Sequence, residues 1–210
     1  MVTEPPKLLE WARSLQAIAQ SGLAYEPSTY DGERYIQVRR IAAEMLEEPP
    51  GDGAVDEIEA LFAGQVGHAT PKIDVRGAVF RGDTILLVKE AADHGWSLPG
   101  GWVDIGESPS EAVAREVLEE SGYRTTPTKL IALIDRDRHA SPPHVWHIWK
   151  AMFLCQLIDD EQGALGSETV MAQFFARAQL EGLEYSRASE WHIDRCFAHH
   201  ADHSLPTEFD

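Results

Sequence analysis

The sequence predicts an α+β protein in which a mixed β-sheet is sandwiched between α-helices and follows a small all-α domain. Three observations lead to this prediction. Residues 1–66 show only helical periodicity, strand-like alternation begins at Ile73, and one well-delimited helix lies between two groups of strand-like runs. We therefore expect a helical N-terminal domain over residues 1–66 and a larger domain over residues 70–205.

Three amphipathic helices are expected in the N-terminal domain. Apolar residues recur at helical spacing over residues 7–21, from about residue 31 to the break at Pro49, and over residues 55–63. About 65 residues enclose little apolar surface on their own, so we expect this domain to dock on another surface. The positions expected to face inward are Leu8, Trp11, Leu15, Ile18, Ala19, Tyr35, Val38, Ile41, Ala42, Met45, Val55, Ile58, Leu61 and Phe62.

Strand-like runs fill most of the larger domain. Strands on both sides of one central helix, together with a helix near the C-terminus, indicate a mixed sheet covered by helices. Trp146 and Trp149 fall in the longest run, where a place in the strand core or on the sheet face is favoured over stacking on a nucleobase. The runs are residues 73–79, 85–88, 129–134, 145–157 and 170–175, and the closing helix is expected over residues 187–200.

The charge of the chain excludes some classes of partner. The net charge is −17, and residues 1–66 hold 12 acidic and 5 basic side chains. Surfaces that bind nucleic acids or membranes need basic patches, so neither partner is expected, and DNA binding by the N-terminal helices is disfavoured. The N-terminus lacks the features of a signal peptide, and Cys155 and Cys196 lack metal-binding spacing, which indicates free thiols in a cytoplasmic protein.

The central helix has clear start and stop signals. Ser108 is suited to the N-cap, Pro109 to the first helical position, and Glu111 completes a capping box. Gly122 supplies the left-handed C-terminal stop. The residues expected on the buried side are Val113, Val117 and Leu118.

Three carboxylates share one face of this helix. Glu116, Glu119 and Glu120 stand at i, i+3 and i+4, and Ala112, one turn earlier, is expected to leave that face open. Carboxylates this close repel one another unless a cation lies among them, and their oxygens are the ligands that Mg²⁺ or Mn²⁺ prefers. For such a helix taken alone, a solvated acidic face is the alternative interpretation.

The stretch from Gly101 to Tyr123 resembles the Nudix box in spacing and identity. A chance match of seven identities at these spacings is on the order of one in a million. The one departure is Tyr123, where the box has an aliphatic residue, and it concerns local packing. The matching residues are Gly101, Glu107, Arg115, Glu116, Glu119, Glu120 and Gly122.

The resemblance implies the Nudix fold and a hydrolase that uses Mg²⁺ or Mn²⁺. It also implies that Arg115 pairs with Glu107 and so tethers the loop to the helix. Glu168, in the loop before the last strand run, is a candidate further ligand or general base, although an ordinary loop glutamate fits equally well. The implied metal ligands are the Gly101 carbonyl and the carboxylates of Glu116, Glu119 and Glu120. The residues expected in catalysis are Glu119, Glu120, Arg115 and Glu168.

The likeness extends beyond the box, through KIDVRGAVF and DRDRHASPPHVWHIWKAMFLC. These stretches are similar to a Nudix subgroup that hydrolyses nucleoside diphosphates linked to a moiety X, such as CDP-choline or ADP-ribose. The resemblance implies a small-molecule nucleotide substrate and a homodimer with the helical domain at its interface. The candidate substrate-binding residues are Arg76, Arg136, Arg138 and His139.

Two other functions remain open from the sequence. One is a Nudix enzyme that sanitises nucleoside triphosphates or removes RNA caps, although the acidic balance argues against long RNA. The other is a non-catalytic nucleotide sensor, which would be expected to have lost box glutamates that are all present here. A zinc site at histidines such as His144 and His147 has no support from their spacing.

Overall fold

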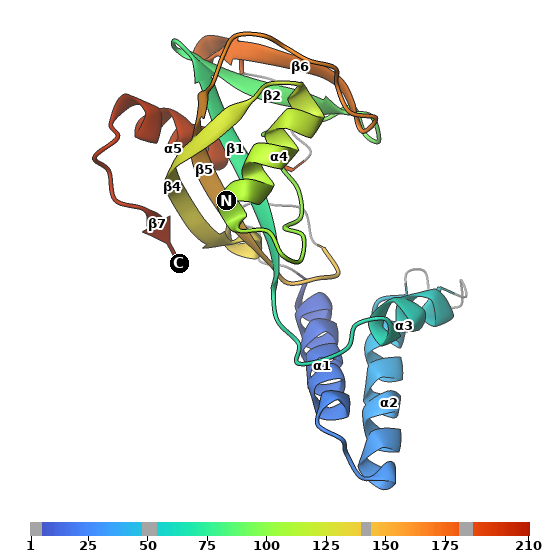
Figure 1. Ribbon diagram of the computed structural model, residues 1–210. Coiled ribbons are helices and arrows are strands. Elements are labelled where there is room, and N and C mark those ends of the chain that lie inside the picture. The colour runs from blue at the N-terminus through green and yellow to red at the C-terminus, as the bar shows by residue number, and fades with distance from the viewer. Residues whose placement is uncertain (1–5, 48–53, 140–143, 181–186) are drawn as a thin grey trace. The chain divides into compact units, whose positions relative to one another are not determined.

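The structure is a computed structural model that describes residues 6–47, 54–139, 144–180 and 187–210. Its contacts divide these residues into two compact units. One unit contains the N-terminal helices up to Pro71 together with the short segment that ends at His147. The other contains the strands and the remaining helices (Figure 1).

The described part of the larger unit forms a mixed sheet, as the sequence predicts. The strand order is β3-β2-β1-β5-β4-β7, and β6 pairs with β2. The pairs β1–β5 and β4–β7 are parallel, and the other pairs are antiparallel. The strands are β1 (Lys72–Arg81), β2 (Thr84–Glu90), β3 (Trp96–Ser97), β4 (Thr125–Asp135), β5 (Ile148–Leu157), β6 (Thr169–Ala176) and β7 (Glu208–Phe209).

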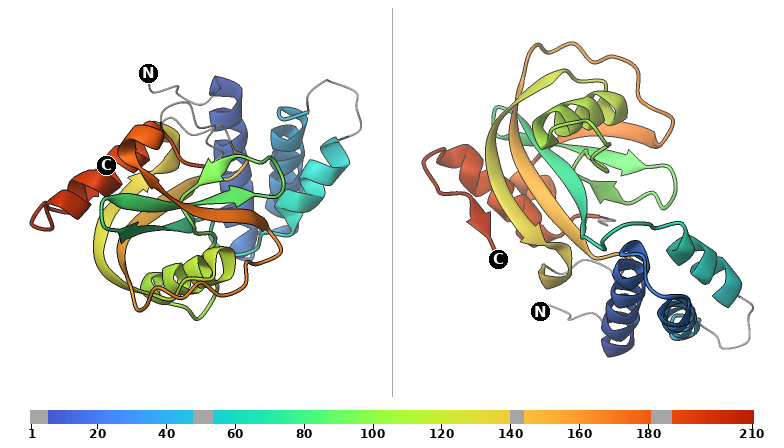
Figure 2. Two further views of the ribbon diagram at one scale, coloured as in Figure 1. Left: turned by 90° about the horizontal axis from the view of Figure 1, so that it is seen from above. Right: turned by 60° about the horizontal axis from the view of Figure 1, so that its bottom comes forward.

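Two helices cover the strands of this unit. The helix α4 (Pro109–Ser121) packs on β1, β4, β5 and β6, whereas α5 (Glu190–Ala201) packs on β4 and β5. Figure 1 and the right view of Figure 2 show the two helices on opposite sides of β4 and β5. Because successive residues of a strand face opposite ways, the strands β1, β2, β4, β5 and β6 contribute side chains to two separate cores.

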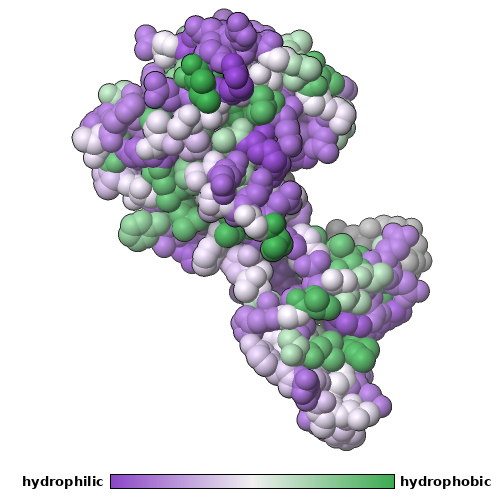
Figure 3. Space-filling view, in the orientation of Figure 1, coloured by the Kyte–Doolittle hydropathy of each residue, from purple (hydrophilic) through white to green (hydrophobic). Residues whose placement is uncertain are grey.

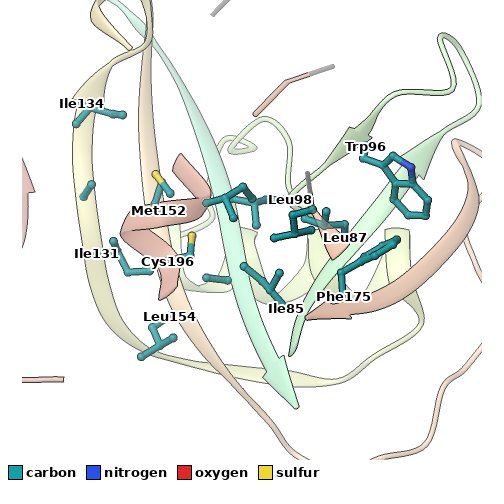
Figure 4. Packing of buried hydrophobic residues seen from close by; sticks show 14 residues of the cluster. Ile85, Leu87, Trp96, Leu98, Ile131, Ile134, Met152, Leu154, Phe175 and Cys196 are labelled. Atoms are coloured by element: carbon teal, nitrogen blue, oxygen red, sulfur yellow. The ribbon is translucent and has the colours of Figure 1, made fainter. Parts of the chain in front are cut away.

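Each face of the strands has its own apolar cluster. Val75 and Val79 of β1 meet Val113 and Val117 of α4 in one cluster. The other joins β2, β3 and β6 to β4, β5 and α5, and Figure 4 shows Ile85, Leu87, Trp96 and Phe175 beside one another. Gly77 permits the close packing of β1 on α4, because a Cβ there would lie 2.5 Å from Val117 Cγ2.

The prediction for the two sides of α4 needs two corrections. Leu118 is 43% exposed rather than buried, and Ala112 is fully buried in the α4 cluster rather than part of an open face. The buried arc of α4 is therefore rotated towards Ala112 and Val113. Tyr123 fits at the end of the box without disturbance, since it is buried and its ring meets Phe174 edge to face with centroids 5.4 Å apart.

The smaller unit contains three helices among its described residues. They are α1 (Lys7–Ala24), α2 (Thr29–Glu44) and α3 (Val55–Ala63). The sequence predicts that α1 ends at Gly22, but the helix continues to Ala24. A Cβ at Gly22 would lie 2.4 Å from Tyr35 Cζ, so this glycine serves the close packing of α1 on α2 rather than a helix stop.

The inward-facing residues of the smaller unit were predicted wrongly in several cases. Its fully buried apolar side chains are mostly alanines, whereas Trp11 is 54% and Ile18 is 56% exposed. Small residues let helices approach closely, and the bulky side chains then remain outside. Figure 3 shows green, hydrophobic residues on the surface of these helices. The predicted inward residues that are instead exposed are Leu8, Trp11, Ile18, Ile41 and Leu61.

The start of β5 also differs from the prediction. The strand begins at Ile148 rather than at Val145, and Val145 and Trp146 pack in the core of the smaller unit. The ring of Trp146 meets Phe62 with centroids 5.7 Å apart, at an interplanar angle of 62°. The prediction of a strand-core or sheet-face residue is therefore wrong for Trp146, which lies outside the strands, partly buried against the helical unit.

Two further findings concern the cysteines and the membrane. Cys155 on β5 and Cys196 on α5 are both free and buried. Burial raises the pKa of the Cys155 thiol to about 12 and also raises that of Cys196. No helix within the described residues has the length and apolar character needed to cross a membrane.

Candidate active site

The site begins with a turn that follows β3 and lies against β1. The backbone N–H of Val75 donates to the Gly101 carbonyl, and that of Gly77 donates to the Pro99 carbonyl, both at 2.8 Å. Gly100 has a φ of +147°, and a Cβ there would lie 2.0 Å from the Val75 carbonyl oxygen. Only glycine allows the chain to run this close to β1.

The helix α4 starts and ends as its sequence predicts. Ser108 and Glu111 form both halves of the capping box. Gly122 closes the helix with a φ of +75°, in the left-handed region. With its ends fixed in this way, the helix presents its acidic residues to the turn: a Cβ at Gly101 would lie 2.9 Å from the Glu116 carboxylate.

The three glutamates occupy different environments. Glu120 is buried, and its Oε2 accepts a hydrogen bond of 2.8 Å from the Gly100 N–H. Glu116 is partly buried beside Gly101, whereas the Glu119 side chain is 57% exposed. The structure therefore brings the turn and the carboxylates together, with one carboxylate held by the turn itself.

Arg115 links the loop before α4 to the acidic face. Its Nε and Nη2 donate to the two carboxylate oxygens of Glu107 at 2.8 and 2.9 Å. Its Nη1 donates to Glu116 Oε1 at 2.9 Å and to Glu119 Oε2 at 3.2 Å. The ion pair implied by the resemblance is present in the expected bidentate geometry, which a lysine could not form.

The electrostatics of the site favour a cation. Burial raises the pKa of Glu120 to about 7, and the nearby Glu90 and Glu116 act in the same direction against Arg76 and the Gly100 N–H. Burial also raises the pKa of Glu116. By contrast, the hydrogen bonds from Arg115 lower the pKa of Glu107. Two partly desolvated carboxyl groups that lack sufficient positive charge fit a divalent cation with oxygen ligands.

The carboxylates do not converge fully in the structure. No group of three or more acidic, histidine or cysteine side chains has the geometry of a metal site among the described residues. Arg115 draws the carboxylates of Glu116 and Glu119 towards itself, and the Gly100 N–H holds that of Glu120. The Gly101 carbonyl accepts one hydrogen bond from β1 and keeps a second lone pair for a ligand.

The loop that carries Glu168 is fixed to the C-terminal end of α4. The Gly166 N–H donates to the Glu119 carbonyl at 2.7 Å, and the Gly163 N–H donates to the Gly122 carbonyl at 2.8 Å. Glu168 itself is exposed, and its carbonyl accepts from the Ala91 N–H at 2.8 Å. Glu168 therefore lies two residues after Gly166, whose backbone is bonded to Glu119. These contacts do not assign the Glu168 carboxylate a role.

The four candidate substrate-binding residues are divided between two places. Arg76 is buried on β1 and bonded to Asp74, whereas the other three follow β4 in or next to a short 3-10 helix, Arg136–Arg138. The Arg138 side chain is 68% exposed, and its Nε lies 3.7 Å from Asp135 Oδ2. From the sequence, Pro142 and Pro143 are expected to stiffen this loop, and both lie outside the described residues.

His139 has partners at the C-terminal end of the chain. Its Nε2 lies 2.9 Å from Asp210 Oδ1, and its ring packs against Trp191 with centroids 4.1 Å apart. Trp149, on β5, is 42% exposed and is a sheet-face residue, as favoured from the sequence. Zinc ligation by His144 finds no support, because its Nδ1 accepts a hydrogen bond from the Trp146 N–H.

Several charged residues near the site were not singled out from the sequence. Asp74, Glu90 and Lys150 are buried in strands. The negative charge of Glu90 contributes to the raised pKa of Glu120. Alternation along β1 puts Asp74 on the face opposite Val75, and only the folded structure shows that this face is buried as well. Trp102, next to Gly101, is exposed, and its carbonyl accepts from Arg115 Nη2 at 3.3 Å.

Comparison with known proteins finds matches to both parts of the chain. Residues 70–197 match the profile of the NUDIX domain, and residues 6–62 match a domain described as the UDP-X-like, N-terminal oligomerisation domain. A candidate ADP-ribose pyrophosphatase of Bacillus subtilis (strain 168) is 42% identical over 197 residues, which is 94% of each chain. An ADP-ribose pyrophosphatase of Methanocaldococcus jannaschii is 31% identical over 55% of this chain and 68% of its own.

Solved structures show the same relationship. The structure of an ADP-ribose pyrophosphatase from Streptococcus suis 89-1591 is 34% identical, with a TM-score of 0.59, over 67% of this chain and all of that one. The structure of a UDP-X diphosphatase is 27% identical, with a TM-score of 0.61, over 99% of this chain and all of that one. The likeness to the second structure spans both units.

Proposed function

This chain belongs to the Nudix hydrolase family, and we propose that it is a divalent-cation-dependent pyrophosphohydrolase of nucleoside diphosphates linked to a second moiety X. It cleaves the P–O–P bond between the two phosphates and releases a nucleoside monophosphate and phospho-X. Within this class we place ADP-ribose first, because two relatives that resemble the chain are described as ADP-ribose pyrophosphatases. CDP-choline, suggested by the resemblance of the sequence, is the second compound to test.

One observation carries the proposal. The buried Glu120 carboxylate, bonded to the turn at Gly100, lies on the same helix face as two further carboxylates that Arg115 orders. This donor set is made only of hard oxygens, which suits Mg²⁺ or Mn²⁺ and not a softer metal. Cations bound there neutralise the diphosphate oxygens, polarise the phosphorus atom and lower the pKa of an attacking water.

The residues of the chain have separate tasks in this proposal. Glu116, Glu119 and Glu120, with the Gly101 carbonyl, hold the cations, and Arg115 keeps the acidic face tied to the Glu107 loop. Glu116 and Glu119 would each offer a cation the carboxylate oxygen to which Arg115 does not donate. Glu168 accepts a proton from the attacking water or adds a ligand, on a loop anchored to the end of α4.

Charge favours an NDP-X substrate over a triphosphate. The chain carries a net charge of −17, and Asp135 and Asp137 lie among the arginines after β4. Arg136 and Arg138 offer enough positive charge for one further phosphate, and a neutral or cationic X is tolerated better than an additional anionic group. Arg136, Arg138 and His139 are therefore kept as the proposed contacts to the distal part of the substrate.

A homodimer is part of the same proposal. The helical unit matches a domain described as an oligomerisation domain, and it leaves Trp11, Ile18 and other large apolar side chains exposed. Monomeric soluble proteins rarely expose much contiguous apolar surface, so burial between two copies explains this composition. A small-molecule substrate, without nucleic acid or membrane partners, and a cytoplasmic location complete the proposal.

The test is product analysis with purified protein. The protein is incubated with Mg²⁺ or Mn²⁺ and a panel of ADP-ribose, CDP-choline, nucleoside diphosphate sugars and nucleoside triphosphates, and the products are separated by chromatography. The expected result is a kcat/KM for the best NDP-X compound above that for every triphosphate, with nucleoside monophosphate as a product. Faster release of pyrophosphate from a triphosphate would refute the substrate class.

A further inference from the structure

The turn at Gly100–Gly101 rests on buried charged side chains of the sheet. Asp74 on β1 and Lys150 on β5 are paired in the register of these parallel strands, so their side chains emerge on the same face. Arg76 follows two residues after Asp74 and shares that face. The exposed fractions are 7% for Asp74, 4% for Arg76 and 1% for Lys150, so none of the three is a surface charge.

These side chains form one connected network. Arg76 Nε and Nη2 donate to the two oxygens of Asp74 at 2.8 and 3.0 Å. Lys150 Nζ lies 3.5 Å from Asp74 Oδ2 and donates to the Arg187 carbonyl at 2.9 Å. Arg187 Nη1 in turn lies 2.6 Å from Glu90 Oε1. Each carboxylate of the network has a cationic partner, and Lys150 and Arg187 are joined through the Arg187 carbonyl. Such pairing is how charges persist in an apolar interior.

The third guanidinium nitrogen of Arg76 forms a hydrogen bond at the start of the turn. Its Nη1 donates to the Leu98 carbonyl at 3.0 Å, directly before Pro99. The backbone N–H groups on either side of Arg76 donate to the Pro99 and Gly101 carbonyls, at 2.8 Å each. Three consecutive residues of β1 therefore hold the turn, and the middle one does so through its side chain.

We infer that Arg76, held in place by Asp74 and Lys150, is a positioning residue for the cation site. It fixes the Leu98 carbonyl and with it the path of the chain through Gly100, whose N–H orders Glu120, and through Gly101, whose Cα lies against the Glu116 carboxylate. The inference rests on the proposed function for the part that the cation plays in hydrolysis. It assigns Arg76 a task other than the substrate contact expected from the sequence.

The bonds of Arg76 favour this task over substrate binding. Each of its three guanidinium nitrogens already donates to a protein acceptor, and the side chain is only 5% exposed. To reach a phosphate, Arg76 would have to leave the buried Asp74 carboxylate with Lys150 alone, at 3.5 Å. Leaving a buried charge without its bidentate partner is strongly unfavourable. Burial would raise the pKa of Asp74, but Arg76 and Lys150 hold it below its usual value.

The test measures Mn²⁺ binding and hydrolysis in parallel on full-length Arg76→Lys. Lysine keeps the charge but cannot bridge Asp74 and the Leu98 carbonyl. The expected result is a dissociation constant for Mn²⁺, measured by electron paramagnetic resonance without substrate, about tenfold higher than in the wild type. The substrate KM at saturating Mn²⁺ should stay within about threefold. Arg81→Lys is the matched control, because Arg81 lies at the far end of β1 and pairs with the exposed Asp160.

The other possible results of this test also support or overturn the proposed role of Arg76. An unchanged Mn²⁺ affinity together with a raised KM would show that Arg76 contacts the substrate and would overturn it. If Arg76→Lys does not fold, Lys150→Met gives the answer, since weaker Mn²⁺ binding in that variant supports the network and unchanged binding refutes it. A wild-type protein that binds Mn²⁺ but hydrolyses no NDP-X compound refutes the proposed function alone, because the Mn²⁺ affinities can still be compared.

Discussion

The two units of this protein use their apolar residues in opposite ways. In the larger unit, large side chains such as Ile85, Leu87 and Met152 are fully buried between the strands and helices. In the helical unit, the buried positions of α1 and α2 are held mainly by alanines, and Trp11 and Ile18 point outwards. The larger unit completes its own core, whereas the smaller one leaves large apolar side chains exposed, which we propose a second copy covers.

The units also differ in where they place charge. In the larger unit, Asp74, Arg76, Lys150 and Glu120 are buried next to the turn of the active site. In the helical unit the ion pairs lie nearer the surface, as in the pair of Arg40 with Asp56. Buried charge is unfavourable unless it is paired, so its concentration beside this turn supports the proposal that the cation site lies there.

The largest expected effect is at the acidic face of α4. Glu119→Gln should leave the fold intact, because the Glu119 side chain is 57% exposed, and should lower kcat by at least about a hundredfold through the loss of a cation ligand. Steady-state hydrolysis and thermal unfolding measure the two effects separately. Glu161→Gln, an exposed glutamate of the same unit, is the control. A loss of less than about tenfold would contradict the assignment of Glu119 as a ligand.

The next effect concerns the tether between the loop and the helix. Arg115→Lys removes the bidentate bond to Glu107 and should lower kcat by about tenfold while the protein stays folded. Hydrolysis at several Mg²⁺ concentrations measures the change. The control is Arg177→Lys, because Arg177 pairs with Asp194 at an exposed site. Equal activity of the two variants would show that the tether is dispensable.

The proposed difference between the two units is tested most directly at the exposed apolar residues of α1. The double variant Trp11→Ser with Ile18→Ser should convert a dimer into a monomer at micromolar concentration, because it removes exposed apolar area without opening the core. Light scattering measures the mass. Ile158→Ser changes an equally exposed apolar residue of the larger unit and should leave the dimer intact. A monomeric wild-type protein would refute the proposed role of this face.

The smallest effect probes the packing of the larger unit. Burial raises the pKa of Cys155 to about 12, and that of Cys196 is raised too, so almost no thiolate exists in the folded state at pH 8. Ellman's reagent should therefore react with neither thiol until guanidinium unfolds the protein. The folded protein keeps these protons to higher pH than the unfolded chain, so their ionisation lowers the free energy of unfolding as the pH rises above about 8.5. Rapid native-state reaction would show a looser core.

The acidic helix face of the proposed cation site could be predicted from the sequence because it is local. Glu116, Glu119 and Glu120 lie within two turns of one helix, and capping signals at Ser108 and Gly122 fix where that helix begins and ends. Helical geometry then determines which side chains share a face. The alternation of apolar residues predicted the strands for the same reason, since a strand also has a fixed period.

Contacts between distant segments could not be predicted in this way. The exposure of Leu118 and the burial of Ala112 depend on how α4 is rotated on the sheet. The distance between α1 and α2 decides which bulky residues of α1 remain exposed. Trp146, predicted to lie in a strand, instead packs against Phe62, which is far away in the sequence.

The sequence by itself determined the family, the order of the elements and the acidic helix face, because each depends on residues near one another in the chain. The tertiary structure decided the surroundings of those residues. It placed Arg76 against Asp74 and the Leu98 carbonyl, brought Lys150 of β5 beside them, and buried Glu120 under the turn at Gly100. These are properties of strand register and layer packing, in which one residue acquires its environment from several separate segments.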